Sequence, residues 1–212
     1  MDLGSLNLEF VEFGFFGTII TAMYWILSSR KEISKKIGKF IRILPILFIS
    51  TFFRFFLAPH FNAIYTDEIG YIRTAYGLTK GELTYNSRLG HPFINSIVFR
   101  IFGVNRLIPT YVSSFFDVLS NFLVYIISAD FLGSEVAAVA SMIFYLFSPL
   151  HLYLSGIGNT EAISNFFFLL SFYSFFKLST TSKNKKWLTI FCIFLSIFSV
   201  QFRVESSIIP FI

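Results

Sequence analysis

APHFNAIYTDEIGYIRTAYGLTKGELTYNSRLGH, residues 58–91, is the long polar stretch in a sequence that otherwise consists of apolar runs. It carries two of the three histidines of the chain and a concentration of charge: Asp67, Glu68, Arg73, Glu82 and Arg88. Apolar runs lie on both sides of it. We interpret the stretch as a polar, reactive surface held between membrane segments.

The composition favours lipid as the solvent for most of the chain. Hydrophobic residues make up 55% of the sequence, charged residues only 14%, and there are 31 phenylalanines. Soluble domains carry about 25% charged residues, so too little polar area is available to cover a water-facing surface. The single cysteine, Cys192, lies in an apolar run, which excludes a disulfide framework and a thiolate metal cluster.

Six apolar runs of different length predict an all-α polytopic membrane protein, for which we expect about five transmembrane helices. The runs are 13–29, 43–58, 107–129, 136–148, 162–176 and 187–202, and the first is about long enough to cross a 30 Å hydrocarbon core. Its start is acidic and no small-residue cleavage site follows, so we expect a retained helix and not a signal peptide. We expect residues 1–212 to form one membrane domain.

The basic residues predict the orientation of these helices. Residues 30–42 hold six Lys or Arg against one Glu, and residues 177–186 hold four Lys. Such clusters mark cytoplasmic loops, and both fall on the same side when the crossings are counted. The net charge of +5 is therefore better explained by membrane orientation than by nucleic-acid binding.

The segment 59–106 is then an outer loop, which we expect to contain two short interfacial helices. The first begins at Thr66 and presents Ile69, Ile72 and Tyr76 before a stop at Thr79-Lys80-Gly81. The second follows Pro92 and ends at Gly103, with an apolar face of Phe93, Ile94, Ile97, Val98 and Ile101.

Four separate segments deliver polar residues to this outer boundary. The polar residues at this boundary are Arg54, His60, Asp67, Glu68, His91, His151, Glu161, Arg203 and Glu205. An ionised carboxylate beside hydrocarbon is costly unless it is paired, hydrated or used. Asp67 and Glu68 could simply complement the positive end of a helix capped by Thr66. Alternatively, one carboxylate acts as a general base toward an acceptor hydroxyl, and Asp67 shares a helix face with Tyr71.

The order of these residues resembles a known family. It is an arginine that ends a transmembrane helix, then an acidic loop, a second acidic loop and an Arg-x-Glu motif: Arg54-Phe55, His60, Tyr65-Thr66-Asp67-Glu68, Tyr71, Ala75, Gly81-Glu82, His91-Pro92, Ser148-Pro149, Ser155, Thr160-Glu161 and Phe202-Arg203-Val204-Glu205. This pattern is similar to that of the GT-C membrane glycosyltransferases, in particular the branch with protein O-mannosyltransferases and aminoarabinose transferases.

The resemblance implies transfer of a sugar, with inversion, from a polyprenyl-phosphate carrier to a lipid, glycan or protein acceptor on the extracytoplasmic face of the cell membrane. It implies Asp67 as the catalytic carboxylate, with Glu68 beside it, and Glu161 as the second acidic residue. The substrate-binding and phosphate-binding candidates are Arg54, Tyr71, Glu82, His91, Arg203 and Glu205. We chose the two arginines among them on physical grounds, because the guanidinium group binds phosphate through two parallel hydrogen bonds.

The sequence assigns no cofactor. A divalent metal is an option, since His60, His91 and His151 could join the carboxylates, but no close ligand spacing supports it. Asp117, in the middle of run 107–129, is either a functional acid or a carboxylate satisfied by Ser113, Ser114 or Asn121.

Two alternative functions differ from an active transferase. The chain ends at Ile212, shortly after its last apolar run, so one alternative is a non-catalytic part or accessory subunit that needs a C-terminal half. The other is a transporter subunit, which is disfavoured because transporters place their polar groups near the bilayer midplane.

Overall fold

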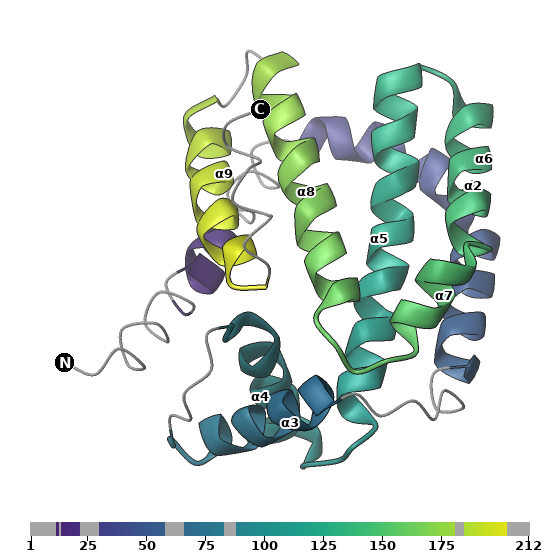
Figure 1. Cartoon of the computed structure of the whole chain (residues 1–212). Coiled ribbons are helices and arrows are strands. Elements are labelled where there is room, and N and C mark those ends of the chain that lie inside the picture. The colour runs from purple at the N-terminus through teal and green to yellow at the C-terminus, as the bar shows by residue number, and fades with distance from the viewer. Residues whose placement is uncertain are drawn as a thin grey trace.

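The computed structural model describes residues 12, 14–21, 30–57, 66–82, 88–180 and 185–202, with the backbone alone for 30–41, 57 and 66. Every regular element in this part of the chain is a helix (Figure 1). Besides a helical segment at 14–21, the helices are α2 (Arg30–Leu57), α3 (Thr66–Thr79), α4 (Gly90–Phe102), α5 (Ile108–Leu132), α6 (Glu135–Leu146), α7 (Pro149–Ser155), α8 (Glu161–Thr180) and α9 (Lys185–Val200). The all-α prediction is confirmed.

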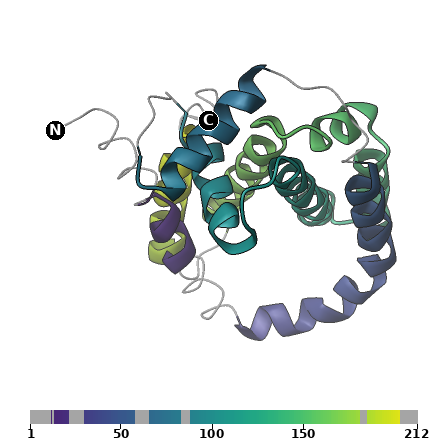
Figure 2. The same cartoon turned by 90° about the horizontal axis from the view of Figure 1, so that it is seen from below.

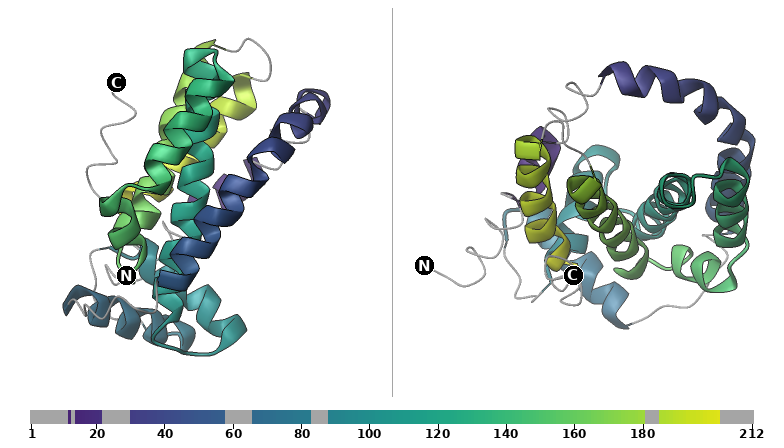
Figure 3. Two further views of the ribbon diagram at one scale, coloured as in Figure 1. Left: turned by 90° about the vertical axis from the view of Figure 1, so that its right-hand side faces the viewer. Right: turned by 90° about the horizontal axis from the view of Figure 1, so that it is seen from above.

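Helix α5 is the centre of the bundle. It packs against α2 and α6 on one side and against α8 on the other, and α8 in turn packs against α9. Viewed along the bundle, α9, α8, α5 and the pair α2 and α6 follow one another in that order (Figure 3). A central helix of this kind can place side chains into contact with three neighbouring helices.

Two of the described helices, α5 and α8, are long and apolar enough to cross a membrane, and the pair α6 and α7, which is bent by 59°, would make a third span. The sequence predicted about five. The difference falls on α9, which has 16 residues, and on runs 13–29 and 43–58, whose side chains are described only in part. The predicted break at Pro149 is confirmed.

Helix α2 differs from the prediction of a basic linker followed by a span. The backbone is helical throughout residues 30–57 and the helix contains Pro45. Its first half swings away from the bundle (Figures 2 and 3). Proline removes one backbone hydrogen bond and its ring crowds the preceding turn, so a bend at this place has a direct cause. The second half packs against α5.

Helices α3 and α4 form a pair that lies across one end of the bundle (Figures 1 and 3). The bounds of α3 are those predicted, and α4 begins two residues before Pro92. Both helices are followed by a glycine with positive φ, at Gly81 and Gly103. A side chain would strain the backbone there, so the two glycines end the helices as expected.

The buried face of α3 differs from the predicted one, whereas that of α4 agrees with the prediction except at Ile101. In α3 the buried side chains are Glu68, Tyr71, Thr74, Ala75 and Leu78, whereas Ile69 and Tyr76 are exposed. In α4, Phe93, Ile94 and Phe99 are buried, but Ile101 is exposed. Contact between α3 and α4 decides which face is covered, and a pattern of apolar residues within one helix does not contain that information.

A cluster of aromatic residues ties α4 to the end of α9. Phe198 and Phe202 are fully buried and pack with Phe167 of α8. The backbone N–H of Gly90 donates to the carbonyl of Gln201 over 3.2 Å. A Cβ at position 90 would come within 3.0 Å of that carbonyl oxygen, so glycine permits the close approach. The start of α4 is thereby fixed against the bundle.

Candidate functional site

The first two turns of α3 carry the acidic pair on two different faces. Asp67 is exposed, while Glu68 is buried at 7% exposure. Successive residues of a helix point about 100° apart, so the pair cannot share one environment. Tyr71 lies one turn after Asp67 and is also buried. The face with Glu68 and Tyr71 therefore meets the protein, and Asp67 stands at the edge of that contact.

The loop between α7 and α8 is held in place by serines of α5. The hydroxyl of Ser114 donates to the carbonyl of Ser155 at 2.9 Å, and that of Ser113 donates to the carbonyl of Asn159 at 3.2 Å. The loop backs the acidic pair, since a Cβ added to Gly158 would lie 2.7 Å from Oε1 of Glu68. The Glu68 carboxylate thus reaches the loop backbone at a place where only glycine leaves room.

Tyr71 is the point at which three charged groups meet. Burial raises the pKa of its phenol, the negative charges of Asp67 and Glu161 raise it further, and the positive charge of Arg88 opposes them. The Thr160 side chain is a hydrogen-bond partner of the phenol. The phenol is therefore protonated at neutral pH and available as a hydrogen-bond donor. Two carboxylates and one guanidinium group, from α3, α8 and the segment before α4, are thus near enough for their charges to act on it.

His91 lies behind Tyr71 and is fully buried. The two rings meet edge to face with centroids 5.1 Å apart. Nδ2 of Asn95 lies 3.2 and 3.1 Å from the two ring nitrogens and donates to the His91 carbonyl at 3.0 Å. Burial lowers the pKa of His91 to about 3. A neutral imidazole therefore packs edge to face against the Tyr71 ring.

The structure brings together five of the predicted site residues from three segments of the chain: Asp67, Glu68, Tyr71, His91 and Glu161. Arg88 joins them. Arg88 belongs to the polar stretch 58–91, and its place in the sequence alone predicted no role for it. Its place next to the Gly90-His91 start of α4 was the available signal.

Glu82 is separated from this group. It is exposed in the turn after α3, where its backbone N–H donates to the carbonyl of Gly77 over 2.9 Å. The ten residues from Asp67 to Gly77 span roughly 15 Å of helix at about 1.5 Å per residue. Arg203, Glu205 and His60 lie outside the described residues. Their predicted roles stay predictions.

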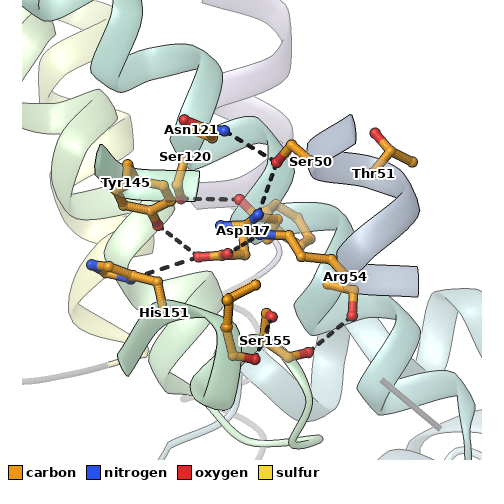
Figure 4. Close-up of polar contacts among 12 residues, drawn as sticks. Ser50, Thr51, Arg54, Asp117, Ser120, Asn121, Tyr145, His151 and Ser155 are labelled. Atoms are coloured by element: carbon orange, nitrogen blue, oxygen red, sulfur yellow. Dashed lines mark hydrogen bonds and ion pairs between the residues drawn. The ribbon is translucent and has the colours of Figure 1, made fainter. Parts of the chain in front are cut away.

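Arg54 lies elsewhere than expected. We predicted it at the outer boundary, where it would either extend toward the lipid headgroups or face a lipid phosphate, but its side chain is 0% exposed and forms an ion pair with Asp117 of α5 (Figure 4). The pair also provides the basic partner that the sequence did not reveal for Asp117. Residues 54 and 117 are far apart in the sequence, and only the packing of α2 against α5 joins them.

The described residues include no group of three or more His, Cys, Asp or Glu side chains close enough to hold a metal ion. His91 lies against Tyr71 at the start of α4, whereas His151 is 3.7 Å from Asp117 inside the bundle. These two histidines therefore belong to different clusters.

The family model for dolichyl-phosphate-mannose-protein mannosyltransferase matches residues 88–208, more than half of the chain. The chain belongs to this family. The matched segment includes Arg88, His91 and Glu161, and α3 precedes it. No curated protein and no solved structure matches the chain.

Membership in the mannosyltransferase family explains the main features of the fold. This is a GT-C type membrane glycosyltransferase family whose donors are sugars linked to polyprenyl phosphate. Apolar helices that could span a membrane and a polar cluster at one end of them agree with such a protein. The localisation in a membrane follows from the same two observations.

Proposed function

We propose that this protein transfers a sugar from a polyprenyl-phosphate carrier to an acceptor hydroxyl, and that the cluster around Tyr71 is its active site. The observation that carries the proposal is the meeting of Asp67, Glu161 and Arg88 around one buried phenol. Such a group contains both a base and a cation, which together are the minimum for this reaction. The active face is the extracytoplasmic one, with residues 59–106 as the catalytic loop of a single membrane domain.

Asp67 is the proposed general base. It is the exposed member of the acidic pair, so an acceptor can reach it, and a base must lie within hydrogen-bond reach of the proton that it takes. The acceptor oxygen loses its proton to Asp67 and attacks the anomeric carbon. The attack comes from the side of the ring opposite to the phosphate. As the new bond forms, the bond from the anomeric carbon to the phosphate oxygen breaks, the polyprenyl phosphate leaves, and the configuration inverts.

The departing polyprenyl phosphate carries negative charge that a cation must stabilise. Arg54 is occupied by Asp117, so we propose Arg88 for this task, together with Arg203. Guanidinium groups bind phosphate through two hydrogen bonds at once. Arg88 is half-buried and so combines access with a partly dry environment, in which charge stabilisation is stronger.

Glu161 and Tyr71 orient the sugar or the acceptor in this proposal. Glu161 begins α8 directly after the loop that contacts Glu68. Tyr71 keeps its proton, because burial and two carboxylates raise its pKa. It can therefore donate a hydrogen bond to a sugar hydroxyl throughout the neutral pH range. Glu68, which is buried, supports the loop and is not accessible to a substrate.

The test is a transfer assay with the protein in proteoliposomes. A radiolabelled polyprenyl-phosphate mannose is supplied with a membrane extract as acceptor source, and label released from the carrier is followed into acceptor. We expect label to leave the carrier only when acceptor is present. The product should show the inverted anomeric configuration by NMR. Absence of transfer by the protein, with the carrier intact, would contradict the proposal.

A further inference from the structure

A second polar cluster lies within the bundle and joins four helices (Figure 4). Nε of Arg54 (α2) donates to Oδ2 of Asp117 (α5), and the Tyr145 hydroxyl (α6) donates to Oδ1 of Asp117 at 2.6 Å. Nδ2 of Asn165 (α8) donates to the Tyr145 hydroxyl oxygen at 2.9 Å. The result is a continuous chain of hydrogen bonds from α2 to α8.

Stability alone gives little reason for this chain. The side chains of Arg54 and Asp117 are 0% and 1% exposed, and burying such a pair costs about as much free energy as the attraction returns. Nη2 of Arg54 is moreover buried without a hydrogen-bond partner among the described residues. Apolar side chains would hold α2 and α5 together at least as well. What directed hydrogen bonds add is a fixed position of each helix relative to its neighbours.

Two members of the hydrogen-bond chain, Asn165 and Asp117, lie close to residues of the site around Tyr71 or of its loop. Asn165 lies one helical turn after Glu161 on the same face of α8. Asp117 lies one turn after Ser113 and Ser114, which hold the loop before Glu161. The hydrogen-bond chain therefore connects α8, which begins with Glu161, to α5, whose serines hold the loop before Glu161.

We propose that Arg54, Asp117, Tyr145 and Asn165 act as positioning residues that set Glu161 against Tyr71. The inference rests on the proposed function, in which Glu161 orients the substrate. Tyr145 is the central member because its hydroxyl both donates to Asp117 and accepts from Asn165. Its ring stacks on His151 with centroids 4.1 Å apart, which restricts rotation of the ring.

The deciding experiment is a double-mutant cycle of Tyr145→Phe with Glu161→Gln in the transfer assay. Residues that act through one another give non-additive effects. A misplaced catalytic group can cost up to about a hundredfold in rate, so we expect Tyr145→Phe alone to lower kcat by about ten- to a hundredfold. In the Glu161→Gln background it should lower kcat by less than about twofold. An equal factor in both backgrounds would overturn the proposal.

Tyr125→Phe is the matched control, because it removes a tyrosine hydroxyl from a residue of α5 that is packed in the bundle but lies outside the hydrogen-bond chain. It should lower kcat by the same factor in both backgrounds, or not at all. Should Tyr145→Phe fail to fold, Asn165→Leu takes its place in the cycle. That substitution breaks the chain at α8 and leaves the Arg54 to Tyr145 contacts intact.

A distance measurement separates this inference from the proposed function. Nitroxide labels at exposed positions 73 on α3 and 168 on α8, in a Cys192→Ser background, report the position of α8 against α3 even if the protein transfers no sugar. We expect a broader distance distribution in Tyr145→Phe than in Tyr125→Phe. Identical distributions in the two variants would overturn the positioning role.

Discussion

The buried polar side chains of this protein are accommodated in three different ways. Asp117 has an arginine and a tyrosine as partners, Glu68 reaches the loop backbone where Gly158 leaves space, and His91 is neutral. The order of Asp67, Tyr71 and Glu161 in the sequence made them site candidates, and the structure places both carboxylates where their charge acts on the Tyr71 phenol. The sequence could not predict the pairing of Arg54 with Asp117, because that contact depends on which helices are neighbours.

At the scale of one residue, His91 predicts an acid-sensitive fold. Its pKa is about 3 in the folded protein and about 6.5 in an unfolded chain, so the unfolded state binds more protons between these values. Stability from this residue is complete above pH 6.5 and decreases on acidification, by up to about 1.4 kcal/mol per pH unit. Thermal midpoints in detergent at pH 7 and pH 5 check this. The thermal midpoint of His91→Gln should fall less from pH 7 to pH 5 than that of wild type. An equal fall in the two proteins would contradict the account.

Arg88 gives a prediction for donor binding. A hydrogen bond to a charged group contributes about 1.5–3 kcal/mol, so Arg88→Gln should lower kcat/KM for the polyprenyl-phosphate sugar by roughly ten- to a hundredfold. Arg88→Lys, which keeps the charge but not the paired geometry, should recover part of the loss. Steady-state kinetics with varied donor make the comparison. A kcat/KM of Arg88→Gln equal to that of wild type would remove Arg88 from the site.

At the scale of elements, the loop between α7 and α8 is a second contact that joins the α3 and α4 pair to the bundle, besides that of α4 with the end of α9. Its backbone is held by Ser113 and Ser114 on one side and contacts Glu68 on the other. The element boundaries were predictable because proline and glycine mark them, as at Pro149, Gly81 and Gly103. The contacts of the loop were not, since serine is an ordinary residue in an apolar helix.

Gly158→Ala tests this contact. The new Cβ would lie 2.7 Å from Oε1 of Glu68 and 2.8 Å from Cβ of Pro109, so the Glu68 carboxylate must turn aside and the loop must move away from the rigid Pro109 ring. Overpacking of this kind costs about 1–3 kcal/mol, which a thermal shift in detergent would register as a lower midpoint. Gly70→Ala is the matched control, because nothing lies within 4 Å of its Cβ. A thermal midpoint of Gly158→Ala as high as that of Gly70→Ala would contradict the loop's tight packing.

At the scale of the whole molecule, the α3 and α4 pair and the end of α8 that carries Lys177 lie at opposite ends of the bundle. Helices α3 and α4 cross one end, while Lys177 and the turn between α5 and α6 lie at the other (Figure 1). The Lys and Arg clusters of the sequence predict that the end with Lys177 faces the cytoplasm. Two of the described helices and the bent pair α6 and α7 are long and apolar enough to cross a membrane, and the bend in that pair falls at Pro149, where the sequence predicts a break.

Thiol labelling of intact cells tests the orientation. Single cysteines at Arg73 on α3 and at Thr180 at the end of α8 are both at exposed positions, and native Cys192 is buried. A membrane-impermeant maleimide should label position 73 in intact cells and position 180 only after lysis. The reverse pattern would place the active face in the cytoplasm.

The central claim is that Asp67 acts as the base in a site built around Tyr71. It is tested most directly by the initial transfer rate of Asp67→Asn, which keeps the size of the side chain and removes its charge. Loss of a general base costs about a hundred- to ten-thousandfold, so we expect a reduction of at least a hundredfold with unchanged membrane insertion. Glu135→Gln, at the other end of the bundle, serves as control and should transfer like wild type. A rate for Asp67→Asn within about twofold of wild type would contradict the assignment.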